Sequence, residues 1–233
     1  MRTSKDIARK FGRRAEIYDE KAQLQKNVAK KLASFLPKSS YENILEIGCG
    51  TGFMTEYLAN VYPDAQKHIT DLSPEMVELC AEKFKDTPNM TFGVLDGQAK
   101  KIAKGYDLVV SSMCVQWFDA PNDVLKEWKT HADVCFATLG PDNFKEWRAL
   151  LAGLDLPFGG RILTDLPGVI SDEIKQVPYS SAYDFLKELK QIGAETATPD
   201  YNILAPRQLK KLIAAYDDQD QKQISWHIVY GHL

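Results

Sequence analysis

This chain lacks long apolar runs, and it lacks the residue clusters that mark metal-binding or disulfide-rich proteins. No stretch of about eighteen residues is apolar enough to cross a membrane. The first residues are polar and charged, without the apolar core of a secretory signal peptide. The four cysteines are scattered, with no C-x-x-C pair and no histidine at ligand spacing. We therefore expect no metal site, no membrane segment and a reducing cytoplasm.

The chain also lacks a strong charge imbalance. Its formal net charge is −3, so nothing global favours a nucleic-acid partner. Apolar residues make up 44% and charged residues 26%, which is ordinary for a globular protein. A length of 233 residues suits a single α/β domain, residues 1–233, with one large core.

Apolar strands and amphipathic helices alternate along most of the chain. The pattern predicts strands at 43–47, 67–71, 90–95, 106–112, 133–138, 174–178 and 224–230. The alternation predicts an α/β fold with a doubly wound, mostly parallel, seven-stranded sheet. We expect residues 1–40 to form a helical cap, residues 141–175 a short lid inserted after the fifth strand, and residues 224–230 an antiparallel edge strand.

The most informative stretch is residues 43–52, an apolar strand that runs into a Gly-Cys-Gly-Thr-Gly turn. Glycine is needed where the chain turns sharply and a ligand approaches bare backbone. A strand, a glycine-rich turn and a helix are how a doubly wound sheet holds a nucleotide-like ligand. The G-x-G-x-G spacing differs from the G-x-G-x-x-G form of dinucleotide sites and disfavours an NAD enzyme. A tight turn without a ligand is the alternative.

Acidic residues follow the next two strands. Asp71 ends the second strand, and Ser73 and Pro74 then start a helix as its N-cap and first residue. An acid in this place accepts hydrogen bonds from both ribose hydroxyls. Asp96 follows the third strand, where a loop or helix-start role is the alternative.

This order of glycine-rich loop, acid and acid resembles the motifs of S-adenosylmethionine (SAM) dependent methyltransferases, which have a Rossmann-like fold. In that family the loop meets the methionine part of SAM, and the two acids meet the ribose and the adenine amine. The resemblance implies SAM as cofactor. It also implies a cofactor-binding set: Glu46, Gly48, Cys49, Gly50, Asp71, Leu72, Asp96, Gly97, Ser111 and Gln116.

Segments outside these motifs resemble the malonyl-acyl-carrier-protein O-methyltransferases, which start pimelate synthesis for biotin. They include F-x-x-x-A-x-x-Y at 11–18, Gln116 with Trp117, and Thr-Leu-Gly-Pro at 138–141 followed by Arg148. The resemblance covers essentially the full length. The chain departs from the family in lacking a Pro-Gly-Gly turn before the fifth strand and in having a short lid.

The resemblance implies methylation of the free carboxylate of malonyl-acyl carrier protein. That carboxylate is ionised at neutral pH, since carboxyl pKa values are about 4, and it needs no general base. We assign Arg148 to grip the malonyl group and Tyr18 to cap the site. Arg148 as a surface charge, Tyr18 as a helix anchor, Trp117 as core and Gln116 as a loop cap remain alternatives.

Acyl carrier protein is strongly acidic, so a basic patch beside Tyr18 is a candidate docking surface on an expected monomer. A solvated helix face is the alternative. One rival function is SAM-dependent methylation of a different small acid or metabolite, and another is a catalytically silent SAM-binding partner protein. The patch consists of Arg9, Lys10, Arg13 and Arg14.

Overall fold

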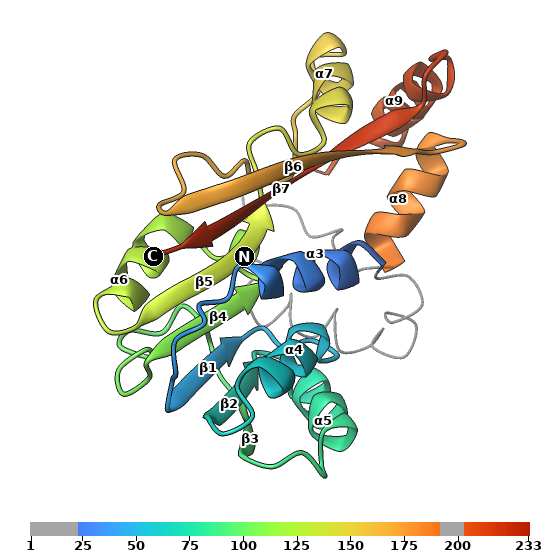
Figure 1. Ribbon diagram of the computed structural model, residues 1–233. Helices are drawn as coiled ribbons and strands as arrows, with labels where there is room; N and C mark the ends of the chain where they lie inside the picture. Colours follow the sequence, from blue (N-terminus) through green and yellow to red (C-terminus); the bar gives the residue numbers. More distant parts are fainter. Residues whose placement is uncertain (1–22, 192–202) are drawn as a thin grey trace.

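A seven-stranded sheet forms the centre of the molecule, with helices on both of its faces (Figure 1). The computed structural model describes residues 23–191 and 203–233. The strands are β1 (Asn43–Ile47), β2 (Gln66–Asp71), β3 (Met90–Val94), β4 (Leu108–Ser112), β5 (Asp133–Leu139), β6 (Val169–Pro178) and β7 (Gln223–His232). The helices are α3 (Gln23–Ser34), α4 (Phe53–Val61), α5 (Pro74–Lys83), η1 (Val115–Trp117), α6 (Pro121–Lys129), α7 (Lys145–Gly153), α8 (Ala182–Gln191) and α9 (Pro206–Asp217).

The strand order is β3-β2-β1-β4-β5-β7-β6. Strands β1 to β5 pair in parallel, whereas β7 pairs antiparallel with both β5 and β6. The expected mostly parallel sheet is confirmed, but the expectation that the last strand lies at the edge is wrong. Residues 224–231 of β7 are all buried, because the strand has a neighbour on each side and is covered on both faces. Strand β6 is the edge, and its side chains are at least partly exposed.

Alternate residues of the central strands point to opposite faces, and each face has its own core. Leu108 and Val110 of β4 pack in the cluster that includes α3 and α4. Val109 between them packs with Leu125 and Trp128 of α6 on the other face. All five side chains are fully buried. This two-sided burial explains the continuous apolar runs of the parallel strands.

A third core lies at the end of the sheet where β5 finishes and β7 begins. Its aromatic rings come from α7, α8, α9 and the adjoining parts of β6 and β7. We call it the cap cluster. It comprises Trp147, Leu151, Tyr179, Ala182, Phe185, Leu212, Tyr216, Ile224 and Trp226.

Most predicted element bounds agree with the structure to within two residues, with two exceptions. Helix α9 was not predicted, although Pro206 at its first turn and Leu212 and Tyr216 on its buried side follow helical rules. Strand β6 begins at Val169, five residues earlier than predicted, because this edge strand has no continuous apolar face. Among the described residues, none of the helices is long and apolar enough to span a membrane.

The region expected to be a lid, residues 141–175, contains α7 and a long connection to β6. The connection returns beside the start of α6, where Asn122 Nδ2 donates to the carbonyl of Thr164 at 3.1 Å. Leu163 is buried there, and Leu166 packs on the core around α6. From this region, α7 contributes the buried members of the cap cluster, and Phe144, Leu156 and Phe158 pack against them.

Candidate functional site

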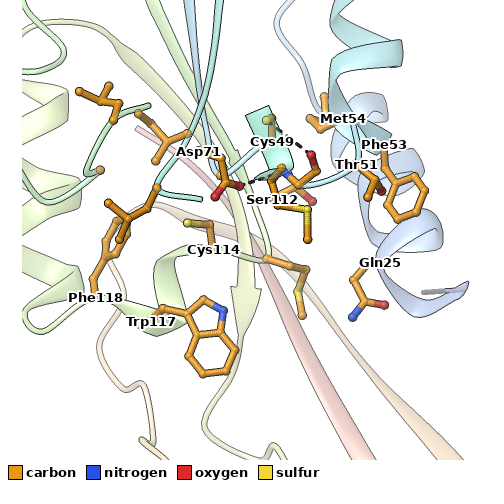
Figure 2. Close-up of a pocket in the computed structure, with 18 of the residues that line it drawn as sticks. Gln25, Cys49, Thr51, Phe53, Met54, Asp71, Ser112, Cys114, Trp117 and Phe118 are labelled. Atoms are coloured by element: carbon orange, nitrogen blue, oxygen red, sulfur yellow. Dashed lines mark hydrogen bonds between the residues drawn. The ribbon is translucent and has the colours of Figure 1, made fainter. Parts of the chain in front are cut away.

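A pocket opens at the carboxyl ends of the parallel strands β1, β2, β3 and β4 (Figure 2). Its volume is about 980 Å³, open mouth included. The walls are formed by the loops after these four strands, with helices α3 and α4 on one side. This edge is where doubly wound sheets bind their ligands.

The loop between β1 and α4 forms the floor of the pocket and needs glycine for two different reasons. Gly48, Gly50 and Gly52 all have positive φ, at 76°, 53° and 88°. A Cβ on Gly48 would also lie 2.5 Å from Cys114 Sγ, so this glycine permits close packing as well. A Cβ on Gly50 would meet nothing within 4 Å, because this residue faces open space. Residues other than glycine would be strained at these φ angles, and the glycines expose bare backbone to a ligand.

Asp71, at the end of β2, fixes this loop and faces the pocket. Its carboxylate accepts hydrogen bonds from the backbone N–H of Gly50 at 3.0 Å and of Ser73 at 2.9 Å. Burial raises the pKa of Asp71, while these N–H groups oppose the rise. A carboxylate keeps further acceptor positions after two such bonds, as the binding of ribose hydroxyls requires.

The far end of the pocket has an apolar lining that includes Ile47, Leu72 and Phe118. Gly97 packs directly on two of these side chains, since a Cβ there would meet Ile47 Cγ2 at 2.5 Å and Phe118 Cζ at 2.8 Å. Asp96 also lines this end. An apolar lining with one acid beside it suits a base that carries an amino group.

Three residues expected to bind the cofactor lie behind the pocket wall instead. Glu46 is 1% exposed and accepts a hydrogen bond from Thr55 Oγ1 at 2.7 Å. Ser111 Oγ donates to the Ile47 carbonyl at 3.0 Å. Gln116 Nε2 donates to the Met113 carbonyl at 2.8 Å, which is the loop-capping role named as its alternative. These side chains hold the loops that line the pocket.

Burial has a strong electrostatic effect on Glu46. It raises the pKa of this carboxyl to about 8, with smaller contributions from Cys80 and Asp71, while the Thr55 hydrogen bond opposes the rise. At neutral pH the protonated form is therefore favoured. A neutral carboxyl under the glycine-rich loop avoids the cost of a buried, unpaired charge.

Sequence reasoning missed several residues of the wall. Ser112 lines the pocket in place of Ser111, since successive residues of β4 point to opposite sides. Met113 also lines the pocket, and its backbone is left-handed, at φ 55°. No sequence motif indicated this conformation. Gln25 and Phe53 enter the wall from α3 and α4, and only their helical spacing could have indicated an inward direction.

Of the two residues expected to handle the acceptor, only Arg148 is among the described residues. Tyr18 lies outside the described residues, as does the whole predicted basic patch of Arg9, Lys10, Arg13 and Arg14. Arg148 lies on α7, where its Nη2 donates to the Pro141 carbonyl at 2.6 Å, and it does not line the pocket.

The described wall carries two acids and no lysine, arginine or histidine. Its electrostatic character favours a cationic ligand such as a sulfonium, and Trp117 adds a ring face that attracts cations. The glycine-rich floor, Asp71 and the apolar far end together fit the amino-acid, ribose and adenine parts of SAM. Among the described residues there is no cluster of His, Cys, Asp or Glu suited to a metal ion.

Comparison with known proteins gives the same assignment. A family described as "Methyltransferase domain" matches residues 44–133. The YcgJ protein of Bacillus subtilis has a similar fold, with a TM-score of 0.61 at 12% identity over 88% of this chain and 97% of that one.

Curated relatives match nearly the whole chain. A malonyl-[acyl-carrier protein] O-methyltransferase of Magnetococcus marinus is 32% identical over 97% of this chain and 90% of that protein. A second, from Ilyobacter polytropus, is 30% identical over 99% and 97%. A biotin biosynthesis bifunctional protein of Bordetella avium is 30% identical over 97% of this chain and 52% of that protein. With the cofactor pocket described above, these full-length matches show that the chain belongs to the malonyl-[acyl-carrier protein] O-methyltransferase family of SAM-dependent methyltransferases.

Proposed function

We propose that this protein methylates the free carboxylate of malonyl-acyl carrier protein, at the start of pimelate synthesis for biotin. The observation that carries the proposal is the end-to-end match to relatives of that name, which includes the cap as well as the cofactor half. The products are a methyl ester and S-adenosylhomocysteine. The ester would remove the negative charge from the end of the acyl chain.

The composition of the described pocket wall agrees with this chemistry. A malonyl carboxylate is already ionised at pH 7, so the site needs to position it and exclude water rather than remove a proton. The described lining has no histidine and no lysine that could act as a general base. SAM supplies an electrophilic methyl group when bound. In well-oriented reactions, holding the two reacting groups in line lowers the free-energy barrier by about 7–11 kcal/mol.

We assign Arg148 to the acceptor side. It lies in the first turns of α7, and its Nε is buried without a hydrogen-bond partner among the described residues. A small rotation of the guanidinium away from the Pro141 carbonyl would present a fork of donors to a carbonyl or carboxylate. Tyr18 remains our candidate for closing the site from the N-terminal cap.

The carrier protein would dock through charge. We propose Arg9, Lys10, Arg13 and Arg14 as the primary contact, with the exposed Lys210 and Lys211 of α9 beside the cap. Such a patch steers an acidic partner, and its effect weakens as salt rises. We further propose a cytoplasmic monomer with one catalytic domain, in which residues 1–40 and 141–175 cover the acceptor.

The direct test is transfer of labelled methyl from SAM to malonyl-, succinyl- and acetyl-acyl carrier protein, with malonyl-coenzyme A alongside. We expect ester on the malonyl carrier and none on the acetyl form. Transfer to free small acids without need of a carrier would favour the rival methyltransferase function. SAM binding without transfer to any acceptor would favour a silent binding protein.

Arg148→Ala tests the acceptor side separately. We expect kcat/KM for the acceptor to fall at least about tenfold, which is about 1.4 kcal/mol, with the SAM dissociation constant unchanged. Lys145→Ala is the matched control, because Lys145 is an exposed cation on the same helix. Equal turnover in both variants would remove Arg148 from the site.

A further inference from the structure

One polar side chain faces the pocket without a hydrogen-bond partner among residues 23–191 and 203–233. Gln25 of α3 is 8% exposed and lines the pocket. Its amide makes no hydrogen bond to the protein within the described residues. Figure 2 shows this amide entering the cavity from the α3 side, across from Asp71 and Phe118. No atom of this amide is among the fully buried unpaired atoms of the described residues, so the amide reaches the open space of the pocket, where it can pair with a group of a bound ligand.

The position of Gln25 is fixed by the packing of its helix. Val28, Ala29 and Leu32 follow it at helical spacing, and all are buried in the core beneath α3. Gln25 extends this buried stripe by one turn, to the point where the core ends and the pocket begins. Its side chain therefore arrives already oriented, which lowers the entropy lost on binding.

The surrounding charges favour a hydrogen-bond donor in this role. The described wall has two carboxylates and no cationic side chain, so a neutral hydrogen-bond donor is what this wall can offer to an anionic acceptor. An amide N–H can hold one carboxylate oxygen. Because the amide is neutral and can contact a single oxygen, it leaves the second oxygen free to react.

We infer that Gln25 is a specificity-determining residue that donates a hydrogen bond to the carboxylate of the methyl acceptor, an inference that rests on the proposed function. The cofactor-facing acids and glycines all follow strand ends, whereas Gln25 comes from a helix that precedes β1. One acceptor oxygen bonds to the methyl carbon as the carbon–sulfur bond breaks. The electron pair of that bond stays on sulfur, and no proton moves.

The test compares three substitutions at Gln25 in the full chain. We expect Gln25→Leu to lower kcat/KM for malonyl-acyl carrier protein by about thirtyfold or more, mainly through KM. The SAM dissociation constant, measured by calorimetry, should stay within about twofold of the original value. Gln25→Asn keeps the amide and should recover part of the loss.

Gln25→Glu gives a signature that a structural role would not produce. A glutamate here repels the acceptor carboxylate when charged, and it can donate a hydrogen bond when protonated. Its activity should therefore rise about tenfold or more from pH 8 to pH 6, while the unsubstituted protein changes little. The control is Gln23→Leu, since the Gln23 amide donates to Asn27 Oδ1 on the exposed side of the same helix.

The outcomes separate this inference from the proposed function. No methyl transfer by the unsubstituted protein, with SAM bound, would overturn the proposed function and this inference with it. An active protein whose Gln25→Leu variant is equally active would overturn only the inference. A variant with weakened SAM binding and an unchanged acceptor KM would also overturn it and assign the amide to the cofactor.

Discussion

The half of the molecule that binds the cofactor and the half that contains the cap cluster are stabilised in different ways. The cofactor half consists of β1 to β4 with their loops and helices, and its ligand-facing acids and glycines lie within a few residues of a strand end. The cap cluster instead joins residues far apart in the chain. Phe144 and Trp226 stack edge to face at 4.7 Å, and Trp147 and Phe185 at 5.1 Å.

This difference suggests how one fold can serve many acceptors. A cofactor site made of local strand–loop–helix units depends little on what packs beyond β5. A cap made of long-range aromatic contacts can change its shape while the sheet and its glycine-rich loop stay the same. Fold alone does not fix function, and here the variable part is physically separate.

The largest expected effects come from substitutions that create a cavity in the core of each half. Phe185 and Leu58 are both fully buried, in the cap cluster and beneath α4 respectively. We expect Phe185→Ala to cost about 3–5 kcal/mol of unfolding free energy and Leu58→Ala about 2–5 kcal/mol. Only Leu58→Ala should weaken SAM binding, because α4 follows the glycine-rich loop. Denaturant unfolding and calorimetry would measure both quantities, and equal losses of SAM affinity would show that the halves are one unit.

A second difference is the buried carboxyl group of Glu46, which lies in the cofactor half. Its pKa rises from 4.5 to about 8 on folding, so between these values the folded chain holds a proton that the unfolded chain has lost. Stability must then fall as pH rises through this window. We expect Glu46→Gln to abolish this slope and to be about 2–4 kcal/mol more stable than the unsubstituted protein at pH 8. Unfolding curves at pH 5, 6.5 and 8 would check this, and parallel slopes in the two proteins would contradict it.

Asp71 tests whether the cofactor half recognises ribose. Asp71→Ala removes the acceptor for two backbone N–H groups and for the ribose, so we expect SAM to bind about 10–100-fold more weakly. Asp86→Ala is the control, as Asp86 is an exposed acid outside the pocket. An unaltered SAM dissociation constant in Asp71→Ala would remove the ribose assignment.

The smallest effect is expected at Gly50, and its comparison partner is Gly105. Both have positive φ, and neither would place a Cβ within 4 Å of another atom. Substitution by alanine should cost each about 1 kcal/mol in stability from backbone strain alone. Only Gly50→Ala should also weaken SAM binding, since Gly50 lines the pocket. Thermal unfolding with and without SAM would separate the two effects.

The same contrast explains what could be predicted from the sequence. Asp71, Gly48 and Asp96 were found because a strand and its following loop are local patterns, and the structure brings all three to one pocket. The sequence alone does not tell whether Ser111 or Ser112 faces the pocket, because a one-residue uncertainty at a strand end reverses the direction of a side chain. In the structure Ser112 lines the pocket, and Ser111 Oγ donates to the Ile47 carbonyl.

Other features could not be predicted because they depend on distant partners. Gln25 faces the pocket only because α3 packs against α4 in one orientation. Helix α9 is held by Trp147, which lies 5.6 Å from Tyr216 ring to ring and is remote in sequence. The upward shift of the Glu46 pKa likewise requires knowledge of complete burial.

The placement of β7 has a consequence for how the protein is made. Because β7 lies between β5 and β6, both strands lack β7 as a neighbour until the chain has been synthesised past residue 223. During translation β5 is therefore an open sheet edge, and β6 has no partner at all. The β1–β5 portion can order early, while the cap must wait for the last strand. A chain whose synthesis stopped before this point would expose an open edge of β5 that can pair with other chains.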